Sequence, residues 1–147
     1  MTSQATSLVT DQSQYSVVID AIENEIAYLS AFDDVYSVIL FRLDGRVLDS
    51  YYSKKNSQTL LFVIRWVKDI ISKTMEELKS GSNSVKYDKD INSKETIPVY
   101  FYRAGNSSIV VTILNSRANT GLLEIEMNRT ARRLGRIIDT KKPITRK

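Results

Sequence analysis

The stretch VYSVILFRLDGRVLDSYYS, residues 35–53, places Asp44-Gly45 between two runs rich in β-branched and aromatic residues. An Asp-Gly pair in this setting is a strong signal for a β-hairpin, because a type I′ turn requires positive φ at both central positions. The stretch therefore predicts two antiparallel strands, at residues 36–43 and 46–53.

Helices are expected on both sides of this hairpin. Apolar residues recur at helical spacing from Tyr15 to Phe32, through the stretch free of Gly and Pro that ends before Gly81, and again within residues 115–138. In the last of these, Asn119 is expected to cap the helix and Gly121 to allow close approach to a strand. The sequence thus predicts three helices.

Three further strands are expected between the second and third helices, in SVKYDKD (84–90), TIPVYFYRA (96–104) and SSIVVTIL (107–114). Pro98 should lie at a strand start or edge, because it cannot donate to the ladder. The element order α-β-β-α-β-β-β-α predicts an α+β fold with a five-stranded antiparallel sheet and three helices.

The 147-residue length suits one domain, expected at residues 15–139. Residues 1–14 are rich in Ser, Thr and Gln, without the features of a signal peptide, and are predicted to form a disordered polar tail. Residues 140–147 are predicted to form a basic C-terminal tail. We expect a cytoplasmic protein, because no apolar run approaches the roughly 20 residues that span a bilayer.

Catalysis and cofactor binding are not expected. The chain has no Cys and no His, which removes the commonest metal ligands and the usual general base at neutral pH. No nucleophile motif is present, so an enzyme is the weakest hypothesis. The Gly-x-x-x-x-Gly-Lys-Ser/Thr loop is absent too, and the chain itself is not expected to bind a nucleoside triphosphate.

Two short segments, DGRVLDS (44–50) in the first hairpin and ANTGLLEIEM (118–127) at the start of the last helix, resemble the roadblock/LC7 family of dynein light chains and GTPase regulators. Profilin-like and longin domains share parts of this architecture. The resemblance implies a single-domain, dimeric platform in which sheets join edge to edge and second helices pair. It also implies binding to small Ras-like GTPases, or an adaptor role.

The second helix carries the residues predicted to contact a partner. Its core face is separated from an aromatic pair, Phe62 and Trp66, which is surrounded by charged residues. Aromatic side chains are typical anchors at the centre of interfaces. The alternative is that a loop or the N-terminal tail covers the pair within the monomer. The predicted partner and dimer surface consists of Phe62, Arg65, Trp66, Asp69 and Lys73.

The third helix and C-terminus hold the positive charge. From Arg129 onward eight Lys and Arg residues face one acid, Asp139, whereas the net charge of the whole chain is +4. The plain interpretation is a solvated helix face; the sharper one is a surface that binds nucleic acid or an anionic membrane. The residues of this predicted basic surface are Arg129, Arg132, Arg133, Arg136, Lys141 and Lys142.

Together these patterns predict a non-catalytic dimeric scaffold or regulator that binds a small Ras-like GTPase, with a GTPase-activating or adaptor role. The dimer is expected to be a homodimer or a heterodimer with another roadblock protein. The alternative function is a basic module that binds nucleic acid or anionic membrane through the last helix and tail.

Overall fold

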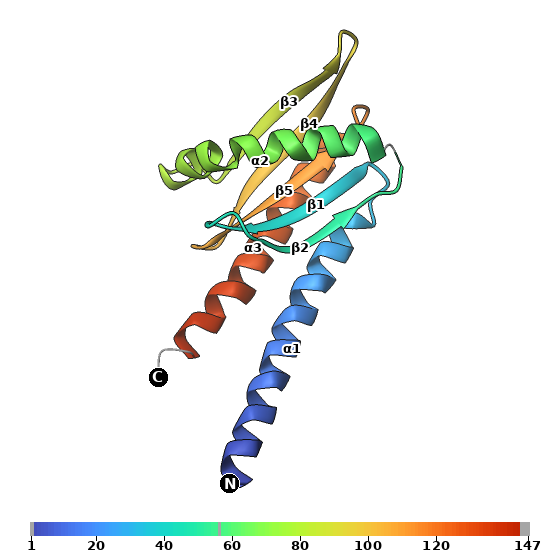
Figure 1. Ribbon diagram of the computed structural model, residues 1–147. Helices are drawn as coiled ribbons and strands as arrows, with labels where there is room; N and C mark the ends of the chain where they lie inside the picture. Colours follow the sequence, from blue (N-terminus) through green and yellow to red (C-terminus); the bar gives the residue numbers. More distant parts are fainter. Residues whose placement is uncertain (1, 56, 145–147) are drawn as a thin grey trace.

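The computed structural model describes residues 2–55 and 57–144, with side chains described for residues 16–55 and 57–139 (Figure 1). The element order is α1 (Thr2–Ser30), β1 (Val35–Arg42), β2 (Val47–Tyr52), α2 (Ser57–Lys79), β3 (Ser84–Asn92), β4 (Glu95–Ala104), β5 (Ser108–Leu114) and α3 (Thr120–Ile144). The strands form one antiparallel sheet in the order β2-β1-β5-β4-β3. The predicted α+β fold, with its element order, is confirmed.

Helices cover both faces of the sheet. On one face α2 packs its apolar side, including Val63 and Val67, against Phe101 and Val111. On the other face α1 and α3 pack together against a second cluster that includes Leu40 and Val110 (Figure 1). The sheet is therefore the middle of three layers.

Burial falls from the centre of the sheet to its edges. Every residue of β5 is buried, as expected for a strand covered on both faces. The edge strand β3 instead alternates between exposed and half-buried residues, and β2 is mostly exposed. The two open edges of the sheet are thus the outer sides of β2 and β3.

The first hairpin forms where the sequence predicted it, but with a different turn. The Gly45 N–H donates to the Arg42 carbonyl at 2.9 Å, and the Arg42 N–H donates to the Arg46 carbonyl at 2.8 Å. These bonds close a three-residue loop with Gly45 at φ 88°. The predicted two-residue type I′ turn is wrong, because a left-handed glycine after a tight turn also satisfies the strand twist.

Pro98 lies inside β4 and not at a strand start, yet its missing N–H costs little. It is aligned with Asp88 of β3, whereas the pairing of β4 with β5 begins only at Val99. The residue is therefore at the end of the central ladder on that side, where the sheet tolerates a proline.

Helix α1 begins at Thr2, and α3 continues to Ile144, so both helices run beyond the expected domain limits of 15 and 139. Residues 2–14 contain no Gly or Pro, and a helix already nucleated by its packed turns extends through such a segment. Met1 and residues 145–147 of the expected tails lie outside the described residues. The division into one domain and two tails stays a prediction.

The close approach between α3 and the sheet occurs at Gly135, not at the predicted Gly121. A Cβ at Gly135 would lie 2.5 Å from the Gly105 nitrogen, whereas one at Gly121 would have only Asn119 within reach, at 3.7 Å. Gly105 has a φ of 74° in the β4–β5 turn. Next to it, the Asn106 N–H donates to the Asp139 carboxylate. Gly135 and Gly105 therefore determine how closely α3 approaches this turn.

Tyr100 and Tyr102 fasten the other end of α3 to β4. The Tyr100 hydroxyl donates to the Glu124 carboxylate at 2.8 Å, and the Tyr102 hydroxyl donates to the Glu124 carbonyl at 3.5 Å. Burial raises the pKa of Tyr102 to about 12, with a contribution from the Glu124 carboxylate. Burial also raises the pKa of Tyr100, helped by its bond to Glu124. Both side chains therefore help to hold α3 on the sheet.

Replacing Gly135 by alanine should destabilise the fold. The added methyl group meets backbone atoms of Gly105, and overpacking of this kind typically costs about 1–3 kcal/mol of unfolding free energy. Gly121→Ala is the matched control, since it adds the same group to the same helix in open space, where alanine favours a helix. Urea denaturation of both variants checks this; equal stabilities would contradict the close approach.

The unfolding free energy should fall as the pH rises from about 10 to about 12. In this window the unfolded chain releases the Tyr102 proton while the folded chain keeps it, so the unfolded state is favoured increasingly. Tyr102→Phe should make the fall shallower, and Tyr52→Phe, on the exposed strand β2, is the control. Denaturation curves at several pH values in this range measure the unfolding free energy. If its fall with pH were as steep in Tyr102→Phe as in the unchanged protein, Tyr102 would not be its source.

Candidate functional site

The outer side of α2 carries the predicted aromatic pair. Phe62 is 49% exposed, whereas Trp66 is half-buried. The Trp66 ring packs edge-on against the Tyr87 ring of β3, with 5.5 Å between the ring centres. The Lys89 ammonium lies 5.3 Å from the centre of the Phe62 ring and 5.2 Å from that of the Trp66 ring. Strand β3 therefore contacts this pair.

Trp66 is linked to the core through β3. The Tyr87 ring packs edge-on against the Phe101 ring, with 5.6 Å between the ring centres. The Tyr87 hydroxyl donates a hydrogen bond to the Glu77 carboxylate of α2 at 3.4 Å. Each edge-on contact stabilises the packing of the rings beyond what the burial of their apolar area contributes. Trp66 is thus held by the monomer, and Phe62 is the aromatic residue of the pair that remains available to a partner.

The charged members of the predicted surface all point to solvent. Arg65, Asp69 and Lys73 are exposed along the same side of α2 as Phe62. The structure thus brings the five predicted residues to one helix surface. Their role in a partner interface stays a prediction.

Two residues of this surface, Tyr87 and Lys89, were missed by the sequence reasoning. Both come from SVKYDKD, whose alternation of polar and apolar residues marks a half-buried strand but does not say which helix lies beside it. We call Phe62, Trp66, Tyr87 and Lys89 the aromatic surface. It lies beside β3, whose outer edge is open because β3 is last in the sheet.

The predicted basic surface on α3 is partly neutralised. An Arg129 guanidinium nitrogen lies 3.6 Å from the Glu126 carboxylate, and one of Arg133 lies 3.8 Å from that of Glu25 on α1. Lys141 and Lys142 belong to the last turns of α3, and their side chains lie outside the described ones. The arginines therefore do not form one uniform positive stripe.

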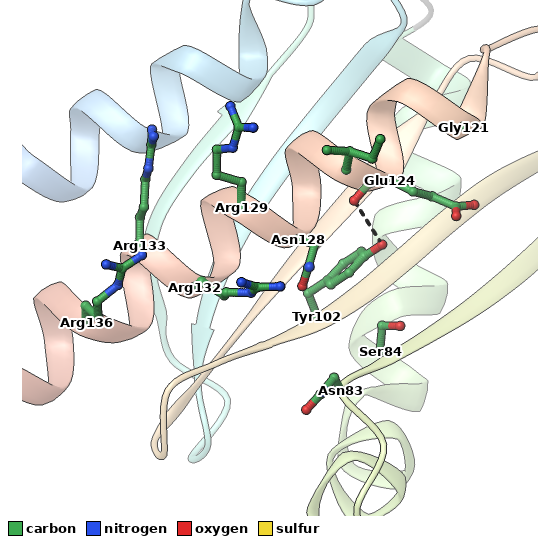
Figure 2. A pocket seen from close by; sticks show the side chains of 11 residues that line it. Asn83, Ser84, Tyr102, Gly121, Glu124, Asn128, Arg129, Arg132, Arg133 and Arg136 are labelled. Carbon is green, nitrogen blue, oxygen red and sulfur yellow. Dashed lines mark hydrogen bonds between the residues drawn. The ribbon is translucent and has the colours of Figure 1, made fainter.

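A hollow of about 760 Å³ opens between α3 and the start of β3 (Figure 2). We call it the arginine hollow, and its lining residues are Asn83, Ser84, Tyr102, Gly121, Glu124, Ile125, Asn128, Arg129, Arg132, Arg133 and Arg136. Figure 2 shows the Arg132 side chain reaching toward Asn128 and Tyr102, while Arg129 and Arg133 extend toward α1. The hollow lies on the α3 side of the sheet, away from the aromatic surface.

The described residues offer neither a metal site nor a membrane-spanning helix. No group of three or more acidic side chains is placed to hold a metal ion. None of the described helices combines the length and the apolar character needed to cross a membrane.

The fold is similar to those of several proteins of known structure. MglC from Myxococcus xanthus matches with a TM-score of 0.63 at 13% identity, covering 78% of this chain and 97% of that chain. MglB from Myxococcus xanthus matches with a TM-score of 0.64 at 13% identity, and the match covers 83% of this chain and 90% of that chain. The gliding protein MglB from Thermus thermophilus matches with a TM-score of 0.53 at 14% identity, and the match covers 86% of this chain and 92% of that chain. At these identities the likeness shows the fold.

The α+β fold that the roadblock/LC7 resemblance implies is confirmed by the structure. A comparison with curated protein sequences found no match. The sequence profile of a family described as AF0774-like protein matches residues 18–128, which include all five strands, the whole of α2, and the segments of α1 and α3 that flank the sheet. The chain therefore belongs to the AF0774-like protein family.

Proposed function

We propose that this protein is a non-catalytic, dimeric scaffold or regulator that binds a small Ras-like GTPase through α2. The observation that carries the proposal is Phe62, a large aromatic side chain left about half exposed on a helix beside an open sheet edge. Exposed aromatic residues next to charged ones are typical of interface centres. The roadblock/LC7 resemblance supplies the class of partner.

The open edge of β3 suits pairing with a second copy of the chain. An unpaired edge strand offers a row of free N–H and C=O groups, which a second sheet can satisfy. An antiparallel pairing centred on Tyr87 places Lys86 opposite Asp88 of the second copy, and the two-fold axis repeats that pair. Both side chains are exposed, and within one strand they already lie 3.9 Å apart. The edge is therefore self-complementary in charge.

Such a dimer brings two aromatic surfaces to one side of a continuous sheet. Each surface lies where α2 meets β3, and the two-fold axis runs beside β3. A GTPase that binds this platform better in one nucleotide state is regulated by the difference in affinity. The nucleotide is expected to come with the partner, because the chain lacks a phosphate-binding loop of its own.

Phe62→Ala should weaken capture of the GTPase roughly tenfold or more, as expected for an aromatic anchor. The measurement is a pull-down with the tagged protein from lysate of its source cells, with a GTP analogue or GDP added, followed by mass spectrometry. Leu122→Ala is the matched control, because Leu122 is similarly exposed, at 54%, on the other face of the sheet. Equal GTPase recovery by Phe62→Ala and the control would count against α2 as the contact.

Asp88→Lys should weaken the dimer, since each Lys86 would then face a positive charge across the pairing. Two such pairs change the dissociation constant roughly two- to tenfold. Exchanging both charges, in Lys86→Asp combined with Asp88→Lys, should restore it. Sedimentation equilibrium measures the three constants, and a double variant as weak as the single one would disprove this register while leaving GTPase binding to be judged by Phe62→Ala.

A further inference from the structure

Arg132 differs from Arg129 and Arg133, which line the same hollow, in having no carboxylate nearby among the described residues. Arg129 and Arg133 each have a carboxylate within 4 Å, at Glu126 and Glu25. Arg132, in contrast, has no hydrogen bond or ion pair with any other described residue, and its side chain extends into the hollow (Figure 2). A guanidinium is always charged at neutral pH and presents several donors in a planar fork. No described residue therefore neutralises the charge of Arg132 in the hollow.

Among the described residues that line the hollow, Glu124 has the only carboxylate, and this carboxylate is directed away from Arg132. The Glu124 carboxylate accepts a hydrogen bond from the Tyr100 hydroxyl at 2.8 Å, and in Figure 2 it points toward the N-terminal end of α3, away from Arg132. What Glu124 presents toward Tyr102 is its backbone carbonyl. An anion in front of Arg132 is therefore not repelled by an adjacent carboxylate.

Side chains with uncharged hydrogen-bond donors line the hollow beside Arg132 and across from it. Asn128 projects from α3 beside the guanidinium, and Asn83 and Ser84 come from the start of β3 (Figure 2). Amide and hydroxyl groups on two sides of a guanidinium fork match the several acceptor oxygens of a tetrahedral oxyanion. The hollow is concave, which favours a compact group over a flat polyanionic surface.

An apolar side chain stands at the rim. Ile125 lines the hollow and is 58% exposed, and Leu122, one turn earlier on the same side of α3, is also exposed. Large apolar side chains next to arginines can contact the organic part of a ligand whose charged end lies deeper. A single hydrated ion leaves these side chains without a role.

We propose that the arginine hollow is a binding site for the phosphate group of a small phosphorylated ligand or a lipid headgroup. Arg132 supplies the charge-assisted contact, Asn128 and Ser84 donate hydrogen bonds, and Ile125 contacts the organic part. The site is independent of the partner surface on α2, because the sheet lies between them.

The test uses the full chain in solution with two probes. Inorganic phosphate is titrated while the side-chain Nε–H signals of arginine and the amide signals of Asn128 are followed by NMR. Separately, sedimentation is measured with vesicles of phosphatidylcholine containing phosphatidic acid, and with vesicles of phosphatidylcholine alone. Binding of phosphate without vesicle binding identifies a soluble ligand, and binding to the phosphatidic acid vesicles identifies a lipid headgroup; either supports the site.

Arg132→Gln should weaken the binding of whichever probe is bound roughly tenfold, because one charge-assisted contact is lost. Arg117→Gln removes the same charge from an exposed position outside the hollow and should leave binding unchanged. Phe62→Ala should have no effect either. Arg132 is exposed, so its replacement is expected to leave the fold intact, which a melting curve checks.

Two results would overturn the proposal. One is that neither probe binds. Another is that Arg132→Gln and Arg117→Gln weaken binding equally, which would mean general attraction to a basic protein. In the first case, binding of a nucleic-acid duplex would instead assign the arginines to a polyanionic surface.

Discussion

The burial of the central strands on both faces is the constraint on which the rest of the structure depends. Every residue of β5 is buried, and β1 and β4 on either side of it are nearly as apolar. One helix cannot cover two faces, so α2 must lie on one and α1 with α3 on the other. The antiparallel order then leaves β2 and β3 as edges. The positions of both surfaces discussed above follow from this arrangement.

The two surfaces differ in the way that their charge is used. On α2 the Lys89 ammonium lies over the Phe62 and Trp66 rings, so that a cation covers an aromatic pair and keeps it compatible with water. On α3 arginines line a hollow, where Arg129 and Arg133 each have a carboxylate within 4 Å, and Arg132 has none among the described residues. The first arrangement suits a protein surface that is covered and uncovered reversibly, and the second suits a compact anion.

The sequence predicts the elements well because their signals are local. Asp44-Gly45 marks a hairpin, and the apolar spacing from Leu60 to Leu78 marks one face of α2. What it could not predict depends on contacts between distant segments. Nothing local distinguishes Gly135 from Gly121, since only the approach of the β4–β5 turn makes one of them obligatory. The cover of Trp66 by Tyr87 and the hollow in front of Arg132 depend on pairing across the sheet for the same reason.

Stability and the arginine hollow are coupled through this glycine. Gly135 lies between Arg132 and Arg136 on α3, and its lack of a side chain lets the helix touch the backbone of Gly105. A larger residue there would push this part of α3 away from the β4–β5 turn, and the Arg132 guanidinium would move with it relative to Asn128 and Tyr102. Because the hollow is lined both by Arg132 and Asn128 of α3 and by Tyr102 of β4, the packing that fixes the last helix against the sheet also fixes the geometry of the hollow.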